Sequence, residues 1–185
     1  MAGCAAAPEP IPTVSSTTDT ASPIPTSTET SPDPTPEPSP EPTSEPTDAP
    51  MLPDPAMLIN EDTEEGAKSA AKYFVELQNY IVAARDVTAW DGRAAEGCVF
   101  CVRTDDLVEQ LEDEDLIREG GGSEVTSVDE TIPDEGTWMV FLTLLESAYV
   151  IKNQSGEITN EGEKVTTDLV FNVKFDSQWL LVDVG

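Results

Sequence analysis

Hydrophobic positions recur with a helical period in one long stretch near the middle of the chain. From Asp62 to Arg85, apolar side chains return at steps of three and four residues, which gathers them on one face of an α-helix. Asp62 or Thr63 can cap the N-terminus of this helix, and Glu64 and Glu65 suit its positive end. This segment therefore predicts a long amphipathic helix.

The pattern becomes irregular between residues 86 and 97, where a short helix at most is predicted. A further helix is predicted from Asp105 to Arg118, with Thr104 as its N-cap and two aspartates in its first turn. The three consecutive glycines at 120–122 end this helix, because glycine disfavours helical backbone.

The last part of the chain has the period of two that is typical of β-strands. Apolar and polar side chains alternate from residue 164 to 175. Asp176 and Ser177 then close a hairpin onto a final strand, Gln178–Val184. This end of the chain predicts two antiparallel strands.

Two earlier segments also have the composition of strands. Ser123–Val128 is predicted as a short strand, and Thr137–Lys152 as one long curved strand that ends in a turn at residues 153–156. Helices followed by an antiparallel meander indicate the α+β class. We therefore expect N-terminal helices packed on one face of a curved antiparallel sheet.

Composition divides the 185 residues into two parts. Fifteen of the 16 prolines precede Met57, whereas every tryptophan, tyrosine and phenylalanine follows it. Without large apolar side chains the first part has nothing to offset chain entropy, and its prolines remove backbone donors. We predict a disordered stalk rich in Pro, Ser, Thr and Glu over residues 5–56, and one acidic α+β domain over residues 57–185.

The chain opens with Met1-Ala2-Gly3-Cys4, which looks like the end of a bacterial lipoprotein signal. In such signals, small residues precede the cysteine that receives the lipid. We interpret residues 1–4 as a truncated signal and expect the remainder upstream of Met1 in the native gene. Cys4 is then the lipid anchor on the outer face of the cell membrane, and the stalk extends the domain into the cell wall. The alternative is that Cys4 is an accidental thiol.

The formal net charge of the chain is -28, and residues 57–185 hold 28 acidic and all nine basic side chains. Such a charge repels nucleic acid and anionic membrane surfaces, so no nucleic-acid partner is expected. The chain has no histidine, which excludes Ser-His-Asp and Cys-His catalysis. We expect neither a metal ion nor another cofactor.

Two cysteines lie three residues apart, at Cys98 and Cys101. In an oxidising compartment such a pair readily forms a disulfide, and the prediction is a staple that fixes the loop before the second helix. A redox role is the alternative, although Gly97 stands where thioredoxin-like sites have a tryptophan. Structural zinc would need two further ligands of a kind that the domain lacks.

Four side chains in the predicted sheet are candidates for a pocket. Glu146 and Asp168 fall within strand patterns and can face a cavity on the concave side of the sheet, where paired carboxylates support acid–base chemistry. The alternative places both on a solvated face. Trp138 and Tyr149 are predicted as core or pocket-rim residues, because aromatic side chains on a sheet usually pack.

The element order and the ending Phe175-Asp-Ser-Gln-Trp179-Leu-Leu-Val-Asp183 resemble the cone-shaped fold of nuclear transport factor 2 and the SnoaL-like proteins. More closely, the chain resembles an uncharacterised family of actinobacterial cell-surface lipoproteins. That resemblance covers about residues 62–185 and rests on Glu65-Gly66-Ala67, Tyr73-Phe74-Val75 and Cys98-x-x-Cys101. It implies no activity, but cone folds frequently dimerise through the sheet, so a homodimer is implied.

These observations favour a surface-anchored lipoprotein that presents a small binding domain outside the membrane, for an unidentified envelope ligand or protein partner. Catalytic side chains are scarce, so a binding protein is favoured over an enzyme. Two alternatives stay open. One is a cone-fold hydrolase or isomerase that uses a pocket carboxylate, and the other is a thiol–disulfide redox protein that uses Cys98 and Cys101.

Overall fold

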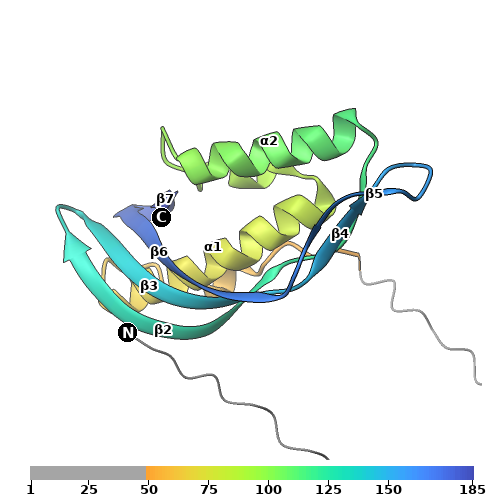
Figure 1. Ribbon diagram of the computed structural model, residues 1–185. Helices are drawn as coiled ribbons and strands as arrows, with labels where there is room; N and C mark the ends of the chain where they lie inside the picture. The colour runs from red at the N-terminus through yellow and green to blue at the C-terminus, as the bar shows by residue number, and fades with distance from the viewer. Residues whose placement is uncertain (1–48) are drawn as a thin grey trace, which may run out of the picture. The chain divides into compact units, whose positions relative to one another are not determined.

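The computed structural model describes residues 49–185 (Figure 1). The predicted signal end with its anchor Cys4, and residues 5–48 of the predicted stalk, lie outside the described residues. Residues 49–56, which we assigned to the stalk, are described together with the domain. They include the buried Pro53 and the start of the short 3-10 helix η1, Pro55–Met57. The folded part thus extends further toward the N-terminus than Met57.

The long predicted helix is present as α1, Glu64–Ala84. Thr63 caps it, because its hydroxyl oxygen accepts a hydrogen bond from the Gly66 amide at 3.1 Å. Arg85 ends it in a left-handed conformation with φ of 57°. The apolar face predicted from the periodicity is buried against the sheet: Ala67, Ala70, Ala71, Phe74, Leu77 and Ile81 are fully buried.

The second long helix, α2, is Val99–Asp113, so the predicted bounds of Asp105–Arg118 were wrong. It begins six residues early because its cap is Cys98, and Thr104 lies inside the helix with its hydroxyl donating to the Phe100 carbonyl at 3.1 Å. The irregular stretch before it contains the short 3-10 helix η2, Val87–Trp90.

In the described part of the chain, seven strands form two antiparallel sheets. The larger sheet has the order β2-β3-β6-β7, with bounds Ser123–Asp134, Thr137–Glu146, Val165–Asp176 and Gln178–Val184. The smaller sheet has the order β1-β4-β5, with bounds Ile117–Gly120, Tyr149–Lys152 and Ile158–Gly162. The predicted hairpin at the end of the chain is confirmed as β6 and β7, and the class is α+β, as predicted.

The two sheets meet at a bend that three strands share. β1, β4 and β5 continue β2, β3 and β6, because backbone hydrogen bonds from Gly121 to Ala148 and from Ser147 to Gly122, both 2.9 Å, bridge the gap between the sheets. Gly121 and Gly122 have φ values of 74° and 121°, which a residue with a side chain rarely adopts. The predicted single strand Thr137–Lys152 is therefore divided at residues 147–148.

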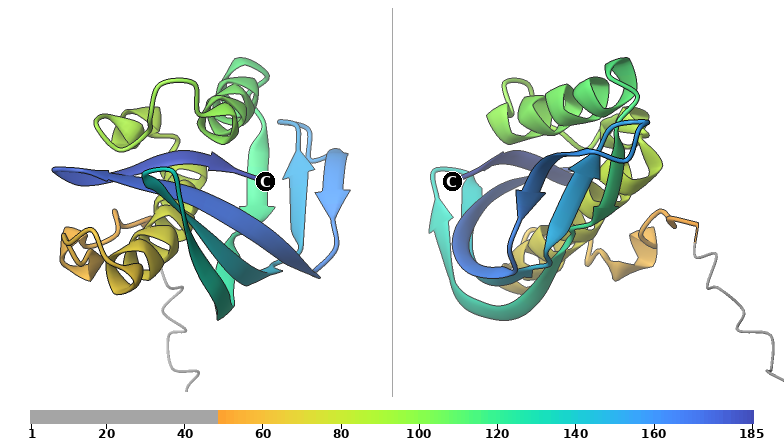
Figure 2. Two further views of the ribbon diagram at one scale, coloured as in Figure 1. Left: turned by 90° about the vertical axis from the view of Figure 1, so that its left-hand side faces the viewer. Right: turned by 45° about the vertical axis from the view of Figure 1, so that its right-hand side comes forward.

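The curved larger sheet wraps around α1, and α2 lies on the same side (Figures 1 and 2). The largest fully buried side chain is Trp179, whose indole NH donates to the Ile59 carbonyl at 2.7 Å. Gly66 lies against the same ring, so close that an added Cβ would stand 2.7 Å from it. Residues before α1 are in this way fixed to the core.

Candidate functional site

A cavity of about 710 Å³ lies between the C-terminal half of α1 and the bend of the sheet. Its walls come from both helices, both sheets and the segment at Pro50. Ligand pockets in proteins typically measure about 300–1,000 Å³, so this cavity is large enough for a small organic molecule. It is about twice the volume of two further hollows, of about 340 and 330 Å³.

Arg118 and Tyr149 form a stacked pair on the sheet side of this cavity. The guanidinium carbon lies 4.9 Å from the centre of the Tyr149 ring, which is cation–π geometry. Two glycines make the pair possible: a Cβ at Gly121 would collide with the guanidinium, and a Cβ at Gly162 would collide with the tyrosine ring. The backbone is thus shaped around both side chains.

The Arg118 guanidinium is half-buried, and no carboxylate of the described residues forms an ion pair with it. Burial lowers the pKa of Arg118, and the nearby Tyr149 opposes that shift. Its Nε is buried without a hydrogen-bond partner. Within residues 49–185, the ion pairs join Lys68 to two glutamates of α1 and Lys152 to Glu119, so Arg118 remains unpaired there.

Asn79 fixes the helix side of the cavity to the bend. Its amide donates to the Ser123 carbonyl at 2.7 Å and accepts from the Ser123 amide at 2.8 Å, as a neighbouring strand would. Arg85 fixes the other end, because its guanidinium donates to the carbonyls of Leu111 and Leu116 beside the end of α2. The cavity wall is therefore rigidly connected to both helices.

Three glutamates also line the cavity. Glu146 is half-buried at the end of β3, whereas Glu124 and Glu163 are exposed. Together with the half-buried Arg85 and Arg118, they give the cavity a mixed character, with two positive groups and three negative groups around it.

The structure places the four predicted pocket residues in different regions. Glu146 and Tyr149 both line the cavity. Trp138 lies at the opposite end of β3, roughly 25 Å along the strand, where its indole NH donates to Asp62 Oδ1 at 2.8 Å. Asp168 is exposed and lies opposite Thr143 in the β3–β6 register, on the face of the sheet that points away from Glu146.

On this outer face, Asp168 shares a hydroxyl group with Asp129. The Thr143 Oγ1 lies 2.9 Å from a carboxylate oxygen of each, and since a hydroxyl donates one proton, it serves one carboxylate at a time. Hydrogen bonds from Ser127 and then Thr143 lower the pKa of Asp129. Glu146 and Asp168 are therefore not brought together as a catalytic pair.

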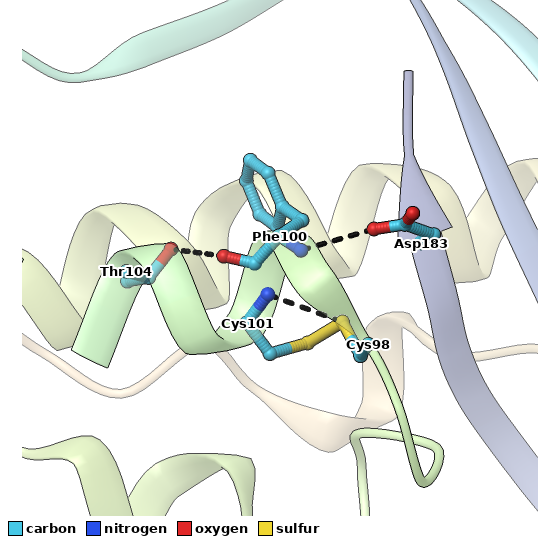
Figure 3. Close-up of a disulfide and its surroundings, with 5 residues drawn as sticks. All are labelled: Cys98, Phe100, Cys101, Thr104 and Asp183. Atoms are coloured by element: carbon cyan, nitrogen blue, oxygen red, sulfur yellow. Dashed lines mark hydrogen bonds between the residues drawn. A yellow bond between two sulfur atoms is a disulfide. The ribbon is translucent and has the colours of Figure 1, made fainter. Parts of the chain in front are cut away.

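Cys98 and Cys101 form a disulfide at the N-terminus of α2 (Figure 3). Both are buried, with 2% and 4% of their surface exposed. Asp183 of β7 accepts a hydrogen bond from the Phe100 amide at 3.0 Å, so the C-terminal strand also caps this helix. The disulfide and the carboxylate together explain why α2 begins at this position.

Asp105 lies further along α2, beside Trp90. Burial raises the pKa of Asp105, and the adjacent Asp106 adds repulsion, whereas the Trp90 indole acts in the opposite direction. Neither the indole NH nor the buried carboxylate oxygen of Asp105 makes a hydrogen bond of normal geometry. These two buried polar atoms without hydrogen-bond partners destabilise the packing of η2 against α2.

Residues 49–185 contain no cluster of three or more His, Cys, Asp or Glu side chains arranged to hold a metal ion. No helix in the same range combines the length and the apolar character needed to cross a membrane.

Several residues of the cavity were not found by sequence reasoning. Arg118 was predicted as the last residue of a helix, and Asn79 lies within the predicted helix Asp62–Arg85 without having been singled out. The available signal was composition: Arg118 is one of only nine basic residues, and it stands two positions before a run of three glycines. A basic side chain in so acidic a chain, close to three glycines, could have identified Arg118 as a candidate site residue.

A family profile matches the chain over most of its length. A search of curated proteins finds none that matches the chain. A profile described as "Family of unknown function (DUF6318)" matches residues 41–185. Because this match covers most of the sequence, the chain belongs to the DUF6318 family.

Proposed function

We propose that this protein is an exported lipoprotein of the actinobacterial cell surface, whose folded domain binds a small ligand outside the membrane. Lipid on Cys4 would provide the anchor, and the Pro-rich residues 5–48 would separate the domain from the membrane. The cavity of about 710 Å³ at the bend is the observation that carries the binding proposal.

We also propose that the domain is a cone fold of the SnoaL-like kind. A long first helix inside a curved antiparallel sheet, which ends in the β6–β7 hairpin, supports this. A homodimer through the sheet remains a prediction that follows from this fold.

Native mass spectrometry of the chain, exported by an actinobacterial host, tests ligand binding. A bound ligand appears as extra mass that is lost when the ions are activated. This extra mass is expected for the natural sequence and for the control variant Glu76→Trp, because Glu76 is an exposed residue of α1 outside the cavity. Ala83→Trp places a large ring at the cavity and should remove that mass. Bare protein in every case would contradict the binding proposal.

Labelling with radioactive palmitate tests the anchor. The exported protein should take up label in the membrane fraction, and Cys4→Ser should be unlabelled and released. Equal labelling of both proteins would exclude Cys4 as the lipid site.

An enzymatic role is the second candidate, and it rests on the half-buried Glu146 in the cavity. If the chain turns over its ligand, Glu146→Gln should abolish turnover and keep binding. The redox alternative has less support, because both cysteine sulfurs are buried and a dithiol site needs an accessible attacking sulfur.

A further inference from the structure

We infer that the cavity binds a small zwitterion of the amino-acid or short-peptide class. Its carboxylate would pair with the Arg118 guanidinium, and its ammonium group would lie toward the glutamates Glu146 and Glu163. This inference rests on the proposed binding function and adds the chemical class of the ligand.

The first argument is the missing counter-ion of Arg118. A half-buried charge without a partner costs free energy, which an incoming carboxylate would recover. The planar guanidinium fork also matches a carboxylate with two parallel hydrogen bonds. The contrast lies within the same small sheet, where Lys152 is satisfied by Glu119 at 2.6 Å and Arg118 is not satisfied by any of the described carboxylates.

The second argument is that the guanidinium is held in place before any ligand arrives. The Tyr149 ring covers one face of it, and Gly121, which has no side chain, lets the backbone lie closely against it. Holding the group in this way lowers the entropy that binding would otherwise cost. Stacking engages the face of the guanidinium and not its N–H edge, and that edge is the part that recognises a carboxylate.

The third argument concerns the charge around the cavity. Glu124, Glu146 and Glu163 repel a ligand with several negative charges, such as a phosphate or a dicarboxylate. A ligand that carries one carboxylate and one ammonium group adds no net charge and can satisfy both kinds of side chain. The acidic surroundings therefore favour a zwitterion over a simple anion.

Three probes of almost equal size test this class with the full chain. They are alanyl-alanine, its C-terminal amide and its N-acetyl form, each titrated by NMR and calorimetry. Alanyl-alanine should bind most tightly. The amide, which cannot pair with Arg118, should bind at least about tenfold more weakly, equivalent to 1.4 kcal/mol. The N-acetyl form should lose several-fold, because the ammonium group is absent.

Variants assign these differences to the residues named. Arg118→Gln should erase the preference for the free carboxylate, and Arg118→Lys should restore part of it. Gly121→Ala should act like Arg118→Gln because its Cβ displaces the guanidinium. Gly122→Ala is the matched control: it also strains the backbone, but its Cβ has no neighbour closer than 3.6 Å. Circular dichroism of each variant checks that the fold is kept.

The outcomes distinguish an error in the ligand class from an error in the proposed binding function. If the amide binds as tightly as the free acid, or Arg118→Gln keeps the preference, the ligand class is wrong, although extra mass in the native spectrum would still support a binding domain. If no probe binds and no extra mass is found, both proposals fail. A carboxylate preference that disappears only in Arg118→Gln and Gly121→Ala supports the inference.

Discussion

The two ends of the curved sheet are packed very differently. Around β6 and β7, the side chains of Phe171, Val173, Trp179 and Leu181 are at most 2% exposed. In the smaller sheet, Ile151 is the only buried residue of three strands, and Ile117 and Ile158 are exposed. Stability is therefore concentrated at one end, which leaves the other end free to form a cavity lined by polar groups.

The largest expected difference between these regions comes from two aromatic residues. Trp179→Ala should cost about 4 kcal/mol of unfolding free energy, because it removes a fully buried ring and leaves a void. Tyr149→Ala, in the half-buried pair of the smaller sheet, should cost less than about 1 kcal/mol. Urea denaturation measures both, and similar losses would contradict the contrast.

Glycines provide the next comparison. Gly66→Ala should cost about 3 kcal/mol, because its Cβ would meet the Glu61 carbonyl oxygen and the Trp179 ring inside the core. Gly97→Ala should cost only about 1 kcal/mol, since nothing lies within 4 Å and the penalty comes from its φ of 85°. Thermal unfolding of the two variants decides the matter. Equal shifts would mean that packing at Gly66 is looser than described.

The disulfide should contribute less than the core contacts. Replacing Cys98 and Cys101 by serine should lower the unfolding free energy by roughly 2 kcal/mol, the entropy expected for closing so short a loop. Chemical denaturation with and without reductant measures it. A reduced protein as stable as the oxidised one would show that Asp183 alone is sufficient to hold the start of α2.

The smallest effect is expected at Asp105. Its raised pKa means that the folded protein favours the protonated carboxyl, so the ionised form destabilises the fold at neutral pH. Asp105→Asn should therefore raise stability at pH 7 by less than about 1 kcal/mol, and the gain should vanish at acidic pH, below the ordinary pKa of an aspartate. A loss of stability at pH 7 would mean that the charged carboxylate is needed by Trp90.

The sequence predicted those elements whose signals are local. The helix α1 carries its own periodicity and its own cap at Thr63, and β6 and β7 alternate and are joined directly by Ser177. The start of α2 was missed because its cap includes Asp183, which is distant in the chain. No local rule reports such a contact.

The cavity was only partly predictable for the same reason. Glu146 and Tyr149 could be chosen as residue types that often line pockets. The division of Thr137–Lys152 at residues 147–148 could not be foreseen, because apolar residues resume at Tyr149 and the glycines at the bend lie where β1 connects to β2. Asp168 shows what could not be predicted. The alternation of side chains along β6 indicates which residues share a face of the sheet, but it does not indicate which face lines the cavity.

The indole rings have a practical consequence for spectroscopy. Trp179 is hydrogen-bonded to the Ile59 carbonyl and Trp138 to Asp62, so two of the three tryptophans report on the short segment that leads into α1. Trp90 reports on the junction of η2 with α2. Detachment of residues 59–62 should therefore shift emission to longer wavelength while circular dichroism stays constant. Global unfolding should change both signals together.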